Sequence, residues 1–353
     1  MIKRTSYIEL NLDGTPLQDH DRSGMLFFDI ETTGFTASTS SLYLIGAVSW
    51  VGDGWVVTQW LAEHPQEEAM ILAEFLAFAK PFTQLIHFNG DRFDIPYLQE
   101  KSRYYQLSDS LSTILSRDLY RMIRPLKTLL KLPALNQRAL EEYLGIFRED
   151  PYTGGELIRV YEDYVKHPTD QALHDLLLHN LNDLEGMLSI LPILSYQAVQ
   201  NGDFRVATAQ IVGDSVIVRA WLPLMLPQTF SYRTEHMYLT GSQDQLAFEI
   251  YGIHDTLKYF FPDYKNYYYL PMEDMAIHKS VAAYVDKEHR EPAKASTCYN
   301  RKKGFYLPQP EAIYTPVFRR DYHDRQMYFA CKQEFVEDTA QMHDYLMQLI
   351  EEI

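Results

Sequence analysis

Two carboxylates stand two residues apart in the segment MLFFDIETTG, residues 25–34. The segment is apolar enough for a buried strand, in which side chains repeat every two residues, so Asp29 and Glu31 leave the same face about 6 to 7 Å apart. Two acids held together at the end of an apolar strand repel each other unless a cation or a proton settles between them. A hard divalent metal ion meets that need. Two solvated acids followed by an ordinary turn explain the segment equally well.

A further acid, Asp94, is set among apolar neighbours in HFNGDRFDIPYL, residues 87–98. The pair Asn89-Gly90 predicts a turn just before it. The alternative is a helix start in which Asp94 is a solvated acid of the first turn. A sequence segment this long and specific is less typical of that alternative, so we include Asp94 in the candidate site.

The last candidates lie in a predicted helix over residues 173–194. Its leucines recur at spacings of three and four, which predicts one apolar stripe. His179 and Asp183 stand one turn apart on a second, partly apolar face. A lone histidine in such a place is more often a satisfied core residue. With Asp183 one turn on, the pair is typical of a metal ligand with a base beside it.

The elements that must position these residues begin a mixed α/β sheet. Two β-branched and aromatic runs, residues 41–50 and 55–63, follow the first strand and predict a meander of three antiparallel strands. Residues 66–80 have helical spacing, and residues 82–88 predict a fourth strand. A crossover helix between strands places the fourth strand in the same sheet. The first 23 residues are predicted to be a polar N-terminal arm.

Three segments resemble, in order, the exonuclease motifs of the DEDD, or DnaQ-like, superfamily within the ribonuclease H-like fold: FDIETTG, HFNGDRFDIPYL and HNLND. The second segment is similar to the motif of the proofreading domain in B-family DNA polymerases. Residues 117–164 resemble bacterial YprB-type ribonuclease H-like proteins. The resemblance covers about residues 24–195, and it implies an α/β fold with a ribonuclease H-like mixed sheet and flanking helices.

The resemblance also implies an activity, namely metal-dependent hydrolysis of phosphodiester bonds at the 3' end of DNA or RNA. It implies that Asp29 bridges two divalent cations, Mg²⁺ or Mn²⁺. Glu31 and Asp183 would complete the ligands of the first cation, and Asp94 would hold the second through water. His179 would be the general base. One position departs from the family pattern, which has a tyrosine four residues before the last aspartate or a histidine five before it. His179 stands four before.

Local basic residues could hold a nucleic acid although the whole chain is acidic. The formal net charge of -16 argues against broad, nonspecific wrapping of nucleic acid. Residues 117–131 carry five basic residues and one acid, so they are the best local candidates for phosphate contacts, with a solvated helix face as the alternative. The candidate nucleic-acid contacts are Thr32, Thr33, Asn89, Arg121, Arg124 and Lys127.

A chain of 353 residues predicts more than one domain. We expect an arm over residues 1–23, an exonuclease domain over 24–202 and an accessory α+β domain over 203–353. The accessory domain is predicted from two β-hairpins and from helices over residues 273–285 and 338–353. Its role is open: it could grip substrate or bind a protein partner.

The remaining features bound the location and the alternatives. Only two cysteines are present, and no run of eighteen apolar residues occurs, so we expect a cytoplasmic protein that neither spans a membrane nor relies on disulfides. Two rival functions stay open. One is a nucleic-acid-binding module with little activity, and the other is a partner-recognition subunit of a DNA repair assembly that acts through the second half of the chain.

Overall fold

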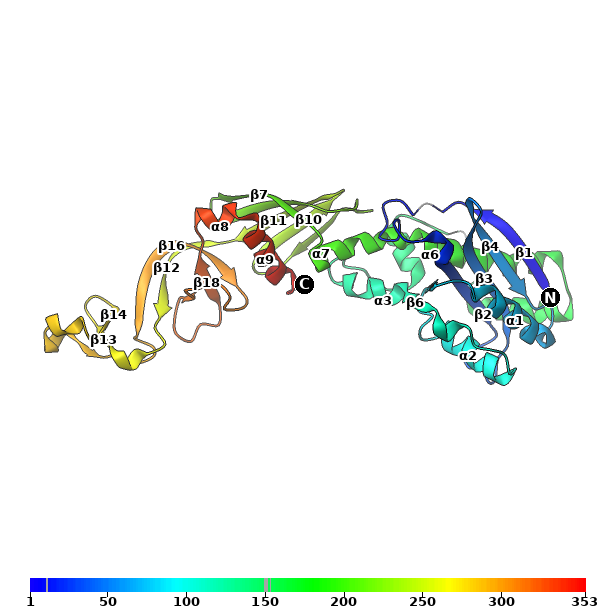
Figure 1. The fold of residues 1–353 in the computed structure, drawn as a ribbon, viewed down its shortest axis with the longest axis horizontal. Helices are drawn as coiled ribbons and strands as arrows, with labels where there is room; N and C mark the ends of the chain where they lie inside the picture. The colour runs from blue at the N-terminus through cyan, green and yellow to red at the C-terminus, as the bar shows by residue number, and fades with distance from the viewer. Residues whose placement is uncertain (11, 149–151, 153) are drawn as a thin grey trace. The chain divides into compact units, whose positions relative to one another are not determined.

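The computed structural model describes residues 1–10, 12–148, 152 and 154–353. It divides into two compact units, residues 1–195 and 196–353 (Figure 1). The predicted division into domains at residues 202 and 203 stays a prediction. Among the described residues, no helix combines the length and the apolar character that crossing a membrane requires.

A six-stranded mixed sheet forms the centre of the N-terminal unit, in the order β1-β4-β3-β2-β5-β6. The pairs from β1 to β2 are antiparallel, whereas β2, β5 and β6 run parallel to one another. The predicted meander and the fourth strand after a crossover helix are therefore confirmed. The strands are β1 (Ile2–Ile8), β2 (Met25–Thr32), β3 (Leu42–Val51), β4 (Gly54–Leu61), β5 (Gln84–His87) and β6 (Leu115–Asp118).

The start of the chain differs from the predicted arm. Ile2–Ile8 is an edge strand that pairs with β4 from Ile2 opposite Leu61 to Ile8 opposite Trp55. Its five central side chains are exposed, because an edge strand is held by backbone hydrogen bonds and needs no apolar alternation. A polar sequence therefore concealed a strand.

Helices cover both faces of this sheet. The helices are α1 (Glu68–Ala79), α2 (Asp94–Tyr104), α3 (Leu119–Ile123), α4 (Gln137–Tyr143), α5 (Gly154–Lys166) and α6 (Asp170–Ser189). One core joins α1 and α2 to the face of β2 that carries Phe28 and Ile30. A second core joins α5 and α6 to the opposite face, where Tyr43 stacks on Tyr161 with ring centroids 4.2 Å apart. Helix α6 contacts β2, β3 and β4.

The C-terminal unit is rich in β-structure, with short helices and a closing helix. A five-stranded antiparallel sheet has the order β7-β8-β11-β10-β9, β12-β16-β18-β17 close a small barrel, and β14-β13-β15 form a third sheet. The strands are β7 (Arg205–Val212), β8 (Ser215–Trp221), β9 (Phe230–Arg233), β10 (Met237–Ser242), β11 (Gln245–Tyr251), β12 (Ile253–Phe260), β13 (Tyr267–Leu270), β14 (Met275–His278), β15 (Glu291–Pro292), β16 (Tyr299–Gln309), β17 (Phe318–Arg319) and β18 (Met327–Ala330). The helices are α7 (Gln197–Asn201), α8 (Gln333–Glu337) and α9 (Thr339–Ile350).

Of the two helices predicted in this unit, one forms and one does not. Helix α9 begins at the predicted cap, where the Asp338 carboxylate accepts hydrogen bonds from the backbone N–H groups of Ala340 and Gln341, both at 3.0 Å. The prediction of a helix over residues 273–285 is wrong. Strand β14 occupies its first half and pairs with β13, because Ala276 is buried against a cluster that includes Cys298, and this packing overrides helix propensity.

Candidate active site

The end of β2 presents two carboxylates toward α6. Phe28 and Ile30 are buried in the core with α1, so the intervening Asp29 and the following Glu31 leave the opposite face of the strand, which α6 covers. Asp29 is partly buried and Glu31 similarly so. The strand period thus places both acids against the helix that carries His179 and Asp183.

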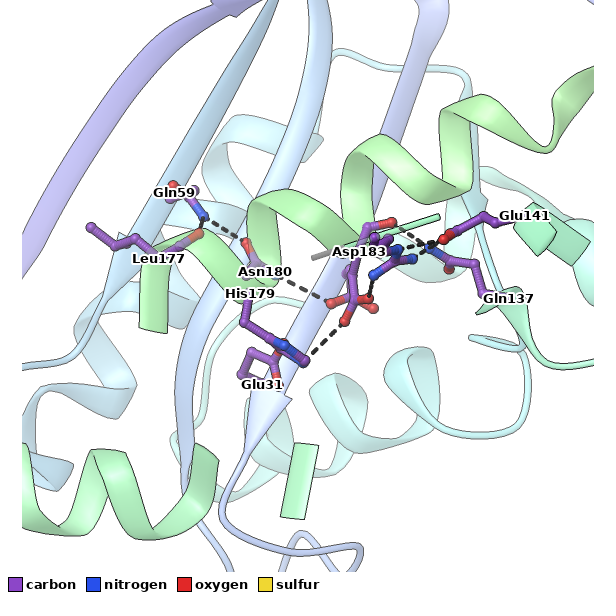
Figure 2. A network of polar contacts seen from close by, with 10 residues as sticks. Glu31, Gln59, Gln137, Glu141, Leu177, His179, Asn180 and Asp183 are labelled. Atoms are coloured by element: carbon purple, nitrogen blue, oxygen red, sulfur yellow. Dashed lines mark hydrogen bonds and ion pairs between the residues drawn. The ribbon is translucent and has the colours of Figure 1, made fainter. Parts of the chain in front are cut away.

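An amide relay orients Asp29. The Asn180 side chain donates from Nδ2 to Asp29 Oδ2 at 3.2 Å, and Gln59 on β4 donates from Nε2 to Asn180 Oδ1 at 2.9 Å (Figure 2). Gln59 also donates to the backbone carbonyl of Leu177, at 2.9 Å. Because the oxygen of Asn180 is occupied by Gln59, its NH₂ group is directed at Asp29.

Glycine is needed on the neighbouring strand for this relay. Gly46 on β3 lies opposite Asp29 in the sheet. A Cβ atom at this position would collide with the Asn180 side chain and with Leu184. The missing side chain therefore lets α6 approach the sheet closely enough for Asn180 to reach Asp29.

Three side chains converge beside Asp29. His179 Nε2 lies 3.3 Å from Asp183 Oδ2 and 3.8 Å from Glu31 Oε1 (Figure 2). The ligand atoms of these three residues all lie within 4.8 Å of one another. The spacing of four residues on α6 thus places His179 and Asp183 on one face, toward the end of β2.

Asp94 approaches the same acids from the start of α2. Its side chain is 6% exposed. Burial raises the pKa of Asp94 to about 7, assisted by the nearby Asp118, while hydrogen bonds from its own backbone N–H and that of Ile30 oppose the rise. Gly90 is packed beside this carboxylate, since a Cβ there would lie 3.1 Å from Asp94 Oδ2.

The electrostatics of Asp29 favour the binding of a cation in this arrangement. Burial raises the pKa of Asp29 well above its ordinary value, and the charges of Glu31, Asp183 and Asp94 raise it further. The hydrogen bond from Asn180 opposes the rise without reversing it. Several hard oxygen ligands with one imidazole, gathered where negative charges repel, fit a divalent cation of the Mg²⁺ or Mn²⁺ class. The residues present therefore suit the metal that the sequence predicts.

A second group of histidine and acids supports the loop between β5 and α2. His87 Nδ1 accepts a hydrogen bond from the Gly90 N–H at 3.1 Å, so its Nε2 carries the proton and donates to Ser116 Oγ at 2.8 Å. Ser116 in turn donates to Asp91 Oδ1 at 2.5 Å. Burial lowers the pKa of His87, consistent with a neutral ring.

Asp118 completes that support. Its Oδ1 atom accepts from the backbone N–H of Asn89 at 2.9 Å and caps α3 through Tyr120 at 3.0 Å. Asn89 adopts a left-handed backbone conformation, with φ of 62°. Backbone N–H groups already donate to the Asp118 carboxylate. The cluster of His87, Asp91 and Asp118 therefore supports the loop that leads to Asp94.

The residues predicted to contact nucleic acid are partly or fully exposed, and several serve the local structure. The Thr32 hydroxyl donates to the Gly34 carbonyl at 2.9 Å, and the Thr33 hydroxyl accepts from the Ser41 N–H at 2.8 Å. Arg121 pairs with Asp91 at 2.6 Å. The basic side chains of Arg124 and Lys127 are exposed. Their role in binding, and that of Asn89, stays a prediction.

Sequence reasoning missed the residues that support the acids. Asn180 directly follows His179, yet a helical amide has no pattern that assigns it to a carboxylate. Gln59 lies in an ordinary strand, and nothing in the strand pattern assigns it to the site. Arg148 pairs with both Glu141 and Asp183, and neither Arg148 nor Glu141 lies in the three motifs. Only the folded chain brings these groups to the site.

A comparison with models of protein families finds a match for the N-terminal part of the chain. Residues 26–194 match the model of the RNase H superfamily. These residues form an RNase H-like domain. The predicted ribonuclease H-like mixed sheet is confirmed, whereas the likeness to YprB-type proteins stays a prediction. A search of curated proteins finds no match to the sequence.

Solved structures show distant likenesses to the chain that contains the RNase H-like domain. The family B DNA polymerase from the archaeon Pyrobaculum calidifontis is 16% identical, covers 50% of this chain and 26% of its own, and gives a TM-score of 0.38. The zinc-bound complex of E. coli ExoI with ssDNA is 16% identical, with coverage of 62% and 54% and a TM-score of 0.31. A structure described as the apo form of a nuclease is 19% identical, with coverage of 51% and 76% and a TM-score of 0.34.

The extent of these matches limits what they transfer. This chain spans about a quarter of the polymerase and about half of ExoI. At such identities and TM-scores, the likeness does not establish an activity for the RNase H-like domain.

Proposed function

We propose that the RNase H-like domain is a metal-dependent exonuclease that hydrolyses phosphodiester bonds of DNA or RNA from the 3' end. The observation that carries the proposal is the convergence of four acids and one histidine from β2, α2 and α6 in one site. Its members are Asp29, Glu31, Asp94, His179 and Asp183. Clustered acids of this kind repel one another, so a folded chain retains them at a cost that cation binding removes.

In this proposal two divalent cations, Mg²⁺ or Mn²⁺, bind to the acids. Asp29 would contact both, Glu31 and Asp183 would hold the first, and Asp94 the second. Bound there, the cations would stabilise the negative charge that develops on the phosphate in the transition state. The relay through Asn180 keeps one oxygen of Asp29 fixed in advance, so its orientation costs little when the site is filled.

His179 is the proposed general base. Its Nε2 atom would take the proton from the attacking water. This atom lies 3.3 Å from Asp183 Oδ2 and 3.8 Å from Glu31 Oε1, so the ring is held beside the acids that would bind the cations. The unusual spacing of four residues from Asp183 is compatible with this role, because it directs the ring and the carboxylate to the same face of α6.

Labelled oligonucleotides test the proposed function. We expect 3'-labelled DNA or RNA to release labelled mononucleotide at once, and 5'-labelled strands to shorten progressively, with Mg²⁺ or Mn²⁺ present. EDTA should abolish both reactions, and readdition of Mn²⁺ should restore them. Comparing DNA with RNA then gives the substrate class. Binding of Mn²⁺ without cleavage of any strand would contradict the proposal and favour a binding module.

Replacing His179 by glutamine tests the base. We expect the single-turnover cleavage rate to fall about 100- to 10,000-fold, because proton transfer by a positioned base contributes about that much. Mn²⁺ should still bind, since the acids remain. His174→Gln is the matched control: His174 is exposed on the same helix and should be replaceable without loss of rate. A His179→Gln rate close to wild type would remove His179 from the mechanism.

A further inference from the structure

A fully buried carboxylate lies behind the site. Glu141 on α4 is 0% exposed, so its charge requires close partners. Arg148 supplies them, because its Nε and Nη2 atoms donate to the two oxygens of Glu141. Gln137 Nε2 adds a hydrogen bond to Glu141 Oε1 at 3.2 Å. The guanidinium of Arg148 is therefore held in one orientation by a forked pair.

The remaining nitrogen of this guanidinium contacts the site. Arg148 Nη1 donates to Asp183 Oδ1, and the same Gln137 amide donates to the Asp183 backbone carbonyl at 2.7 Å (Figure 2). Both the side chain and the backbone of Asp183 are thus tied to the group formed by Gln137, Glu141 and Arg148. Helix α4 and Arg148, five residues after its end, both act on this one position of α6.

The helix surface is shaped to admit this group. Gly186 lies on α6, close to Asp183 in sequence, and its missing side chain leaves the space in which the group packs. A Cβ atom there would collide with Glu141, Arg148 and Gln137 together. A glycine inside a helix is less favourable than alanine, so close packing is the benefit that offsets this cost here.

The contacts of Asp183 divide its two oxygens between two tasks. Oδ1 is occupied by Arg148, whereas Oδ2 faces His179 Nε2 at 3.3 Å and lies with the Glu31 ligand atom inside the 4.8 Å cluster. A carboxylate that rotated freely would offer either oxygen, or both. With Arg148 in place, one defined oxygen points toward the cluster.

We propose that Arg148 is a positioning residue for cation binding: anchored by the buried Glu141, it occupies one oxygen of Asp183 and presents the other to a divalent cation shared with Glu31. The inference rests on the proposed function, because it assumes that the acids bind such a cation. Partners of this kind orient the ligands they contact, and their loss typically lowers metal affinity about 10- to 100-fold.

The charge of Arg148 and its orienting contact with Asp183 have opposite effects on cation affinity. The pairing of Arg148 with Glu141 determines which effect is larger. An isolated arginine beside the acids would weaken cation binding by repulsion. Glu141 neutralises Arg148 at close range, so the pair adds little net charge and orientation is left as its main effect. Removing both charges together therefore isolates orientation without changing the net charge of the chain.

The test is Mn²⁺ affinity, measured by isothermal titration calorimetry on the full chain without nucleic acid. For Arg148→Met combined with Glu141→Gln we expect affinity to fall about 10- to 100-fold with native circular dichroism retained. The matched control is Lys101→Met with Glu68→Gln, another buried pair of the same domain, 2.8 Å apart with side chains 8% and 4% exposed. The control should bind Mn²⁺ as wild type does.

Arg148→Lys keeps the test available if the double variant does not fold. A lysine ammonium retains the charge beside Glu141 but cannot fork to two carboxylates, so affinity should again fall about tenfold. Unchanged or tighter Mn²⁺ binding in a folded variant would overturn the inference. Failure of the wild type to bind Mn²⁺ at all would instead overturn the proposed function, so the two failures are distinguishable.

Discussion

Asp29→Asn is expected to slow metal-dependent cleavage of a labelled oligonucleotide by at least about 1,000-fold, since a ligated cation contributes several kcal/mol to the transition state. Asparagine keeps the shape and can still accept the hydrogen bond that Asn180 donates. It removes the charge at the centre of the acid cluster, next to Glu31, Asp183 and Asp94. The loss should therefore appear in cation binding and rate while the fold is retained.

Asp53→Asn is the matched control for this experiment. Asp53 is exposed in the turn between β3 and β4, and the same chemical change there should leave the rate unaltered. Circular dichroism and Mn²⁺ titration of both variants separate loss of fold from loss of the site. An Asp29→Asn rate within tenfold of wild type would contradict the proposed role of Asp29 as a ligand of both cations.

Asp94→Asn is expected to stabilise the metal-free protein at pH 8. The pKa of Asp94 is about 7 in the folded protein, against an ordinary value of 3.8. Between these values the folded protein holds a proton that the unfolded chain has released, so stability falls as the pH rises from 4 to 7. The gap corresponds to about 4 kcal/mol. Asparagine cannot ionise and should remove this cost.

Urea unfolding in EDTA at pH 4.5 and pH 8 measures the effect. Asp94→Asn should weaken the decline between these two values and raise the free energy of unfolding at pH 8. Asp91→Asn, in the loop just before α2, should instead lower the free energy of unfolding at pH 8. Burial opposes ionisation of Asp91, but hydrogen bonds from Ser116 and Arg121 prevail and lower its pKa. Destabilisation by Asp94→Asn at pH 8 would show that its charge is already compensated without metal.

The local spacing of residues was sufficient to predict the geometry of the acids. Asp29 and Glu31 share a strand face because side chains alternate, and His179 and Asp183 share a helix face because they are four residues apart. These relations depend only on backbone period, so a sequence contains them. The order of β2, β3, β4, α1 and β5 followed from the same periodicities and from turn residues.

The supporting groups could not be predicted, since they depend on contacts between distant segments. Gln59 and Asn180 are 121 residues apart, and Arg148 is 35 residues from Asp183. No period links such pairs. In two other places, contacts with distant segments outweighed the local sequence pattern. The polar segment β1 is held as an edge strand by backbone pairing, and Ala276 joins a strand because its neighbours in space bury it.

The proposed ligands come from three segments that are far apart along the chain: β2, the first turn of α2, and α6. Two cations that share Asp29 as a ligand would link all three segments, since none of the segments could move away without breaking a bond to a cation. Such cations bind the folded chain only and stabilise it by mass action. Metal binding would then reduce the mobility of α6 relative to the sheet, because metal–ligand bonds would add to the packing contacts.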